Sequence, residues 1–120
     1  MRRKIEERMV AAIKSEKPFR ESNTEVLPVW SGDSEHSVVL GVKVFLHGNC
    51  IAQITLSEKR IDLHTCGWDT VTTTSRMNAI LDGLTDGAFH VTCRTYDKTM
   101  GKECRLVQCA ASDWNVNLGY

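Results

Sequence analysis

The sequence predicts an α+β domain with an N-terminal helix, an antiparallel β-meander, one central helix and a C-terminal β-hairpin. Two segments, 3–16 and 74–84, carry apolar residues at the three- and four-residue spacing of an amphipathic helix. Between and after them, strand-like runs recur about every ten residues with short polar turns, which is typical of an antiparallel meander. A chain of 120 residues suits one hydrophobic core, so we expect residues 1–120 to fold as a single domain.

The N-terminal helix is expected to carry a short apolar stripe within a basic surface. Ile5, Met9 and Ile13 form the stripe, and Pro18 forbids continuation because proline lacks the N–H that a helix needs. The first twenty residues carry seven Lys or Arg and three Glu, which gives a net charge of +4. Residues 1–18 are therefore expected to project towards a partner or to form a homodimer. The alternative is a helix that rests on the core with a solvated basic face.

The meander is expected to contain four strands separated by polar turns. Pro28 suits an edge or irregular strand, because it cannot donate a hydrogen bond to a neighbouring strand. His47, Gly48 and Asn49 predict a tight hairpin turn, since glycine and asparagine tolerate positive φ. The segment SNTEV, 22–26, is expected to be a loop. The expected strands are VLPVW at 26–30, SVVLGVKVFLHG at 37–48, CIAQITLS at 50–57 and RIDLHT at 60–65, with turns at 31–36 and 57–59.

The central helix is expected over Thr74–Leu84. One of Thr72 or Thr73 is expected to cap its first turn with a side-chain oxygen, and Gly87 is expected to end it. The tail at 112–120 is expected to be flexible apart from two apolar anchors. The C-terminal hairpin is expected to pair FHVTCRT at 89–95 with CRLVQCA at 104–110, through a turn at 97–103.

The composition argues against a strong overall charge and against a membrane segment. Lys plus Arg and Asp plus Glu number 15 each, so no global basic field favours nucleic acid. No apolar run has the length of a signal peptide or a transmembrane helix. The cysteines number five and lie mostly among apolar neighbours, where free cysteine packs as a small hydrophobe. These features favour a protein of a reducing cytoplasm.

No motif predicts catalysis or a metal site. Structural zinc sites usually show two close ligand pairs, whereas the closest pairs here are His64 with Cys66 and Cys104 with Cys109. The sequence contains no P-loop, nucleophile elbow, HExxH or paired-carboxylate signature. We therefore expect no catalytic residue, no metal and no cofactor. The alternative is a hydrolase or transferase that uses Cys66 or Cys93 with a nearby histidine.

Charged and aromatic residues around the central helix are candidates for binding a partner. A helix N-terminus suits a phosphate group, and Trp68 with Arg76 would join a stacking platform to a positive charge. Alternatively, Trp68 belongs to the core and Arg76 pairs with Asp62 or Asp69. Asn78 lies at the boundary of the buried stripe, where its amide could tie the helix to the preceding turn. The candidate partner-binding residues are Arg2, Arg3, Arg8, Lys59, Arg60, Trp68, Arg76 and Asn78.

Three segments carry a resemblance to a known family. They are SNTEV at 22–26, VFLHGNCIAQI at 44–54 and LHTCGWDTVTTTSRMNAIL at 63–81. In that order they resemble the motifs GNT-x-V, LHGN-x-IA and L-x-x-x-GW-x-T-x-TT-x-x-R-x-NAIL of a family of short bacteriophage and prophage proteins. The first helix and the tail lie outside the resemblance.

The resemblance implies a phage origin and expression in the cytoplasm of the infected bacterial host, and it implies no activity. Small accessory phage proteins commonly act by binding host components. We therefore expect a non-enzymatic accessory protein that binds a host or defence-system protein, in host takeover or as an anti-defence inhibitor. The alternative is a nucleic-acid-binding phage protein that uses the basic helix, Arg76 and Trp68.

Overall fold

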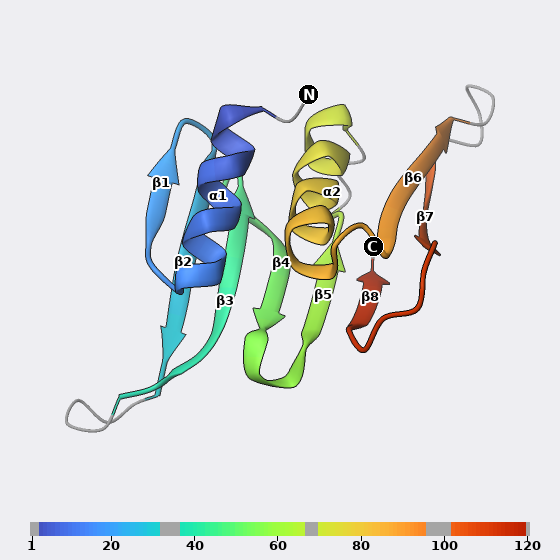
Figure 1. Ribbon diagram of the computed structural model, residues 1–120. Helices are drawn as coiled ribbons and strands as arrows, with labels where there is room; N and C mark the ends of the chain where they lie inside the picture. Colours follow the sequence, from blue (N-terminus) through green and yellow to red (C-terminus); the bar gives the residue numbers. More distant parts are fainter. Residues whose placement is uncertain (1–2, 32–36, 67–69, 96–101, 120) are drawn as a thin grey trace.

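The amphipathic N-terminal segment forms helix α1, Lys4–Ser15, in the computed structural model, which describes residues 3–31, 37–66, 70–95 and 102–119 (Figure 1). Met9 and Ile13 of the predicted stripe have no exposed surface. Glu16 ends the helix in the left-handed conformation, with φ of 55°, before the chain reaches Pro18. The prediction of an N-terminal helix that stops ahead of the proline is therefore confirmed.

A six-stranded sheet forms the second layer of the fold. The strands from β1 to β5 pair antiparallel with their neighbours, so the predicted meander is confirmed. A short 3₁₀ helix, Leu56–Glu58, replaces the predicted turn between the fourth and fifth strands. The strands, in their order across the sheet, are β1 (Phe19–Glu21), β2 (Thr24–Trp30), β3 (Val39–Leu46), β4 (Asn49–Thr55), β5 (Arg60–His64) and β8 (Asn115–Gly119).

Two strands of this sheet differ from the prediction. The first, β1, was not predicted; it forms a hairpin with β2, which begins at Thr24 within the segment 22–26 that was expected to be a loop. The other, β8, occupies the tail that was expected to be flexible, and it pairs parallel with β5. Val116 and Leu118 of β8 pack against the hydrophobic core, which accounts for the order of this segment. A parallel pairing between segments about fifty residues apart leaves no local signal in the sequence.

The turn between β3 and β4 consists of His47 and Gly48, both in the left-handed backbone conformation. His47 and Gly48 have φ of 52° and 80°, which matches a two-residue hairpin loop with both central residues at positive φ. The predicted tight turn is confirmed, although His47 and not Asn49 accompanies Gly48 at positive φ. Before it, Val42, Val44 and Leu46 alternate with half-buried residues and lie buried under the helices.

The central helix, α2, spans Val71–Thr85 and begins three residues earlier than predicted. Thr70 is the N-cap, because its Oγ1 accepts a hydrogen bond from the N–H of Thr73 at 3.1 Å. The prediction of Thr72 or Thr73 as the cap was therefore wrong. The helix ends at Asp86, and Gly87 follows with φ of 77°, close to the predicted stop.

The predicted C-terminal hairpin is confirmed and consists of β6 (Phe89–Thr95) and β7 (Lys102–Gln108), with β7 beginning two residues earlier than expected. The two strands form a sheet separate from the six-stranded one. Figure 1 shows α1 and α2 side by side on one face of the large sheet, with the hairpin beside α2. Gly83 of α2 meets Val10 of α1 so closely that a Cβ atom at this position would collide with it. The α+β class is confirmed. No helix among the described residues is long and apolar enough to cross a membrane.

Candidate functional site

The basic residues predicted on α1 lie at the surface. Arg3 is exposed at the start of the helix, and Arg2 lies outside the described residues. Arg8 forms two hydrogen bonds with the carboxylate of Glu21 on β1, at 2.8 and 2.6 Å. This bond to Glu21 raises the pKa of Arg8 above its ordinary value. One of the predicted cations on this helix is thus already paired within the chain.

The predicted cations at the start of β5 are also paired with acids. Lys59 donates to Asp113 at 2.5 Å, and this bond lowers the pKa of the Asp113 carboxyl. Arg60 donates to Asp62 at 2.9 Å. Figure 1 places the start of β5 at the opposite end of the sheet from the first turn of α1. The predicted basic residues therefore do not converge on one surface.

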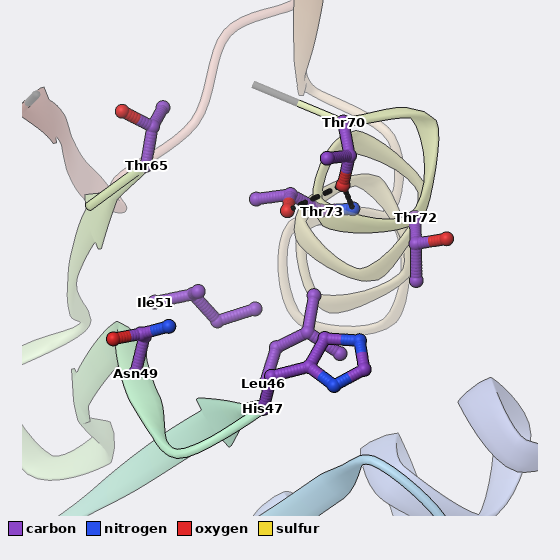
Figure 2. Close-up of a pocket in the computed structure, with 8 residues that line it drawn as sticks. All are labelled: Leu46, His47, Asn49, Ile51, Thr65, Thr70, Thr72 and Thr73. Carbon is purple, nitrogen blue, oxygen red and sulfur yellow. Dashed lines mark hydrogen bonds between the residues drawn. The ribbon is translucent and has the colours of Figure 1, made fainter. Parts of the chain in front are cut away.

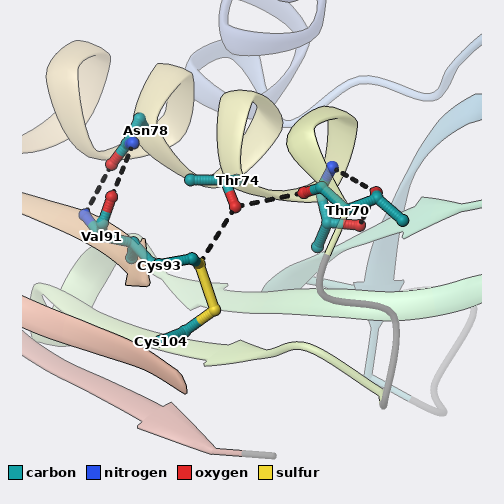
Figure 3. The surroundings of a disulfide bond; sticks show 7 residues. Thr70, Thr74, Asn78, Val91, Cys93 and Cys104 are labelled. Carbon is teal, nitrogen blue, oxygen red and sulfur yellow. Dashed lines mark hydrogen bonds between the residues drawn. A yellow bond between two sulfur atoms is a disulfide. The ribbon is translucent and has the colours of Figure 1, made fainter. Parts of the chain in front are cut away.

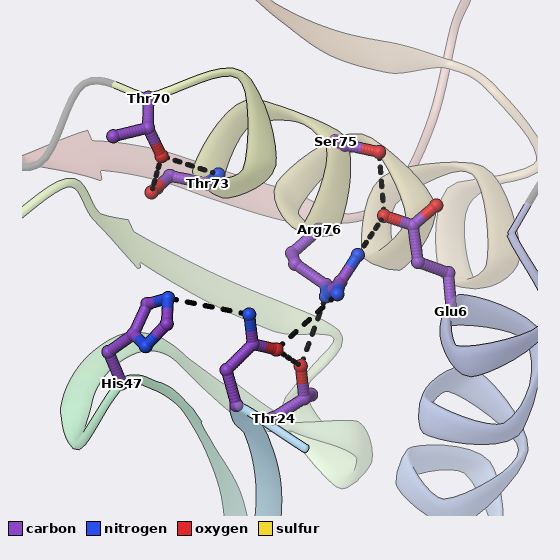
Figure 4. Close-up of polar contacts among 8 residues, drawn as sticks. Glu6, Thr24, His47, Thr70, Thr73, Ser75 and Arg76 are labelled. Carbon is purple, nitrogen blue, oxygen red and sulfur yellow. Dashed lines mark hydrogen bonds and ion pairs between the residues drawn. The ribbon is translucent and has the colours of Figure 1, made fainter. Parts of the chain in front are cut away.

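Arg76 faces the interior, and this corrects its prediction as a partner-binding residue (Figure 4). It is 3% exposed, and its Nη1 lies 2.7 Å from Oε2 of Glu6, which is 1% exposed. Nε donates to Oγ1 of Thr24 at 3.1 Å, and Ser75 donates to the same Glu6 oxygen at 2.6 Å. Burial of the charge inside this network leaves Arg76 unable to reach a phosphate in this conformation. Its internal partner is Glu6, whereas Asp62 pairs with Arg60; Asp69 lies outside the described residues.

Asn78 joins α2 to the hairpin (Figure 3). Its Nδ2 donates to the carbonyl of Val91 at 3.0 Å, and its Oδ1 accepts from the N–H of Val91 at 2.7 Å. The side-chain amide therefore makes the two hydrogen bonds with the backbone of Val91 that a neighbouring strand would otherwise make. Asn78 was expected to tie the helix to the preceding turn, and the structure corrects this to β6. Trp68, the remaining candidate residue, lies outside the described part of the chain.

The apolar stripe of α1 is not a free surface, which corrects the prediction of a projecting helix. Met9 and Ile13 have no exposed surface, and Ile5 is half-buried. The helix packs on α2 and on the first two strands of the sheet. A homodimer that uses this stripe would first have to expose the core, so the predicted route to self-association is closed in this conformation.

Exposed apolar side chains instead lie at the end of β2 and at the start of β3. We call these two segments, Leu27–Trp30 and Val38–Gly41, the apolar arm. Trp30 is 56% exposed, Val38 60% and Leu40 55%. Leu40 continues the face of Val42 and Val44 by strand alternation, but β2 and β3 extend past the end of α1 (Figure 1). Residues of the buried stripe thus become exposed where the helix layer stops. The alternation in the sequence indicated this apolar stripe, but it did not indicate where the helices stop covering it.

The cysteines differ most from the prediction. Cys93 and Cys104, directly opposite each other in the β6–β7 ladder, form a disulfide (Figure 3), so the expectation that cysteines pack as free thiols was wrong for this pair. Cys93 is therefore no nucleophile in this state. The thiol of Cys66 donates to the carbonyl of Cys50 at 3.1 Å. Among the described residues, no group of three or more His, Cys, Asp or Glu is arranged to hold a metal.

A cysteine–histidine pair that the sequence did not indicate lies at the end of the hairpin. The Sγ of Cys109 lies 3.0 Å from Nδ1 of His90, and Cys109 is exposed. Cys50 is half-buried, and burial raises the pKa of its thiol. Cys109 and Cys50 therefore differ in access, and the raised pKa of Cys50 lowers its own fraction of reactive thiolate.

We expect Ellman's reagent to modify Cys109 at least about ten-fold faster than Cys50 in the unreduced protein. The exposed thiol beside an imidazole is accessible and has a base within reach, whereas the raised pKa of Cys50 keeps it protonated. Mass spectrometry of quenched samples measures both rates, and His90→Gln should slow Cys109 alone. Equal rates at the two positions would contradict the expectation.

A cavity of about 190 Å³ lies between the start of α2 and the ends of β3, β4 and β5 (Figure 2). Leu46 and Ile51 supply its apolar surface, and both are almost fully buried. The lining residues are Leu46, His47, Asn49, Ile51, Thr65, Thr70, Thr72 and Thr73. This cavity brings two of the three motifs of the resemblance together, since LHGN and the threonine-rich segment line its two sides.

The comparisons with known proteins agree with the phage origin that the resemblance implied. The sequence model of one protein family, described as Kyanoviridae Gp96 protein, matches residues 2–117. The match thus includes α1 and most of β8, which the resemblance did not cover. No curated protein and no solved structure matches the chain.

Proposed function

Since the chain belongs to the Kyanoviridae Gp96 family of bacteriophage proteins, we propose that it is a non-enzymatic accessory protein that binds a host protein. The observation that carries the proposal is the apolar arm, with Trp30, Val38 and Leu40 more than half exposed. Contiguous exposed apolar side chains are typical of protein interaction sites. Tryptophan is also among the residues that dominate binding energy at such sites. A host defence protein is included among the partners proposed.

The paired charges favour a protein partner over nucleic acid. Arg8, Lys59 and Arg60 each contact a carboxylate of the same chain, and Arg76 is buried. Non-specific affinity for nucleic acid comes mainly from free Lys and Arg side chains that displace counterions from phosphates. By contrast, four of the six large apolar residues that are exposed in the described part of the chain, Leu27, Trp30, Val38 and Leu40, lie on the arm.

The partner is proposed to contact the side chains of the arm and not its backbone edge. β1 pairs with β2 only up to Val26, so the distal part of β2 forms an open edge among the described residues. Pro28 lies in this open part and has no N–H to donate. Proline on an edge strand opposes the addition of a further strand. The predicted role of Pro28 as an edge residue therefore fits a side-chain interface.

We expect Trp30→Ser and Leu40→Ser to weaken binding of the host partner by about ten-fold or more each. Both side chains are over half exposed, so their loss should leave the fold intact. The partner is isolated on the full-length chain from infected-host lysate, with and without nuclease, and its affinity is then measured with purified proteins by calorimetry. We propose that the protein acts in the host cytoplasm, so the soluble fraction of the lysate is used.

Val107→Ser on β7 provides the matched control, because Val107 is an exposed apolar residue outside the arm. It should bind like the unsubstituted chain. The proposal is wrong if arm variants and control bind equally well, or if every captured partner disappears with nuclease. The second outcome, with an affinity that falls steeply with salt, would support the nucleic-acid alternative instead.

A further inference from the structure

One face of the apolar arm continues a surface that the helices cover along the rest of β2 and β3 (Figure 1). The covered part includes Val26, Val42 and Val44, which are at most 1% exposed. Strand alternation continues this face into Trp30 on β2 and Leu40 on β3, and both are more than half exposed. The same apolar surface is therefore covered by a helix at one end and exposed at the other.

Helix α1 shows which kind of segment covers this surface within the chain. It lies along β2, and Met9, Ala12 and Ile13 on its buried side belong to the same hydrophobic core as Val26. Their spacing of three and four residues is that of one face of an α-helix. The stretch Leu27–Trp30 is about 10 Å long at the rise of a β-strand, which corresponds to about two helical turns. The arm therefore has the length and the polarity to receive a short amphipathic helix.

Other common modes of peptide binding fit the arm less well. An added β-strand needs backbone N–H groups along the open edge of β2, and Pro28 lacks one. A polyproline segment needs a groove lined by aromatic rings, and Trp30 is the one aromatic residue of the arm. A helix that packs side chain against side chain needs neither feature.

Two lysines at the end of α1 determine the charge of the helix that fits. Lys14 and Lys17 are exposed, and neither forms a salt bridge with any residue that the structure describes. Glu16, the acid between them, is half-buried, so two positive charges and one negative charge lie at this end of α1. Lys17 is two residues before Phe19, which pairs with Val26, the residue that precedes the arm. Carboxylates on an incoming helix would therefore meet unpaired positive charge.

We infer that the host protein presents an acidic amphipathic helix to the arm, an inference that rests on the proposed function. The apolar side chains of this helix, spaced three and four residues apart, pack on Trp30 and Leu40 in the layer that α1 occupies. Its Asp and Glu side chains face Lys14 and Lys17. The bound helix thus extends the helix layer of the fold over the part of the sheet that α1 leaves exposed.

The test selects binders to the purified full-length chain from a displayed library of random peptides of about 15 residues, a length that allows helix formation. We expect the enriched peptides to carry apolar residues at three- and four-residue spacing together with Asp or Glu, and to show helical NMR shifts when bound. Trp30→Ser and Leu40→Ser should each weaken their affinity by about ten-fold or more. Val107→Ser, outside the arm, should leave the affinity unchanged.

Two double variants test the charges separately from the apolar contact. Lys14→Gln with Lys17→Gln should weaken binding of the enriched peptides by about five-fold and make it less dependent on salt. Arg3→Gln with Lys4→Gln is the matched control, because it removes two exposed charges at the opposite end of α1. This control should bind like the unsubstituted chain.

The assignment of an acidic helix is wrong if the enriched peptides bind in an extended conformation, or if the two double variants bind equally well. It is also wrong if no enriched peptide depends on Trp30 or Leu40. Weakened binding of the host partner by Trp30→Ser alongside any of these results would leave the proposed function intact and remove only the helix. Host binding that Trp30→Ser and Leu40→Ser leave unchanged would remove both.

Discussion

Arg76→Met is expected to lower the free energy of unfolding by about 3–5 kcal/mol, because it removes the buried guanidinium that pairs with the carboxylate of Glu6. Both side chains are at least 96% buried, so water cannot replace the lost contact. The substitution also removes the donor to Thr24, whose hydroxyl is buried beside the guanidinium. Urea unfolding followed by circular dichroism measures the change.

Two further variants separate the effect of breaking the buried ion pair from the effect of removing any positive charge. In the double variant Glu6→Met with Arg76→Met, most of the lost stability should return, since apolar residues then replace both charges. Arg60→Met breaks the exposed pair with Asp62 and should change stability by less than about 1 kcal/mol. If Arg76→Met proved as stable as Arg60→Met, the buried network would not stabilise the fold as described.

Asn78→Ala is expected to cost about 2–4 kcal/mol, because it leaves both the N–H and the carbonyl of Val91 without a partner. Val91 is 2% exposed, so these backbone groups cannot turn to water without moving β6. The hairpin should loosen first, since the Asn78 amide makes two of the hydrogen bonds that join it to α2. Hydrogen exchange of the Val91 amide should increase more than exchange within β3 or β4.

The control for this prediction is Asn117→Ala on β8. Asn117 donates to Asp62 at 3.2 Å in an exposed position, so its loss should cost less than about 1 kcal/mol. Asn78→Asp keeps the acceptor for the Val91 N–H but loses the donor, and it should fall between the alanine variant and the unsubstituted chain. Unchanged exchange at Val91 in Asn78→Ala would show that the hairpin is held by packing alone.

Local patterns were sufficient to predict most elements of the fold. The helices follow from apolar residues at helical spacing, and the His47–Gly48 turn follows from residues that tolerate positive φ. The prediction of the helix cap failed because several neighbouring residues are equally suitable. Thr70, Thr72 and Thr73 are all suitable caps, and only the hydrogen bond to Thr73 identifies Thr70.

The candidate site was less predictable than the fold. Arg76 and Asn78 were predicted to contact a partner, but both have partners within the chain. The apolar arm was missed because Leu40 belongs to the same alternating stripe as Val42, which is buried. Exposure at this point depends on where α1 ends above the sheet. A sequence pattern identifies a face of a strand but not the element that covers it.

The sequence by itself determined the class of the fold, its helices, its meander and its hairpin, because each depends on periodicity within a short segment. The tertiary structure alone decided which distant groups meet. It paired Arg76 with Glu6 across a separation of 70 residues, Cys93 with Cys104, and β8 with β5. The physical reason is that such contacts are selected by the burial of apolar surface and of charge in the assembled chain. Neighbouring residues in the sequence carry no trace of that selection.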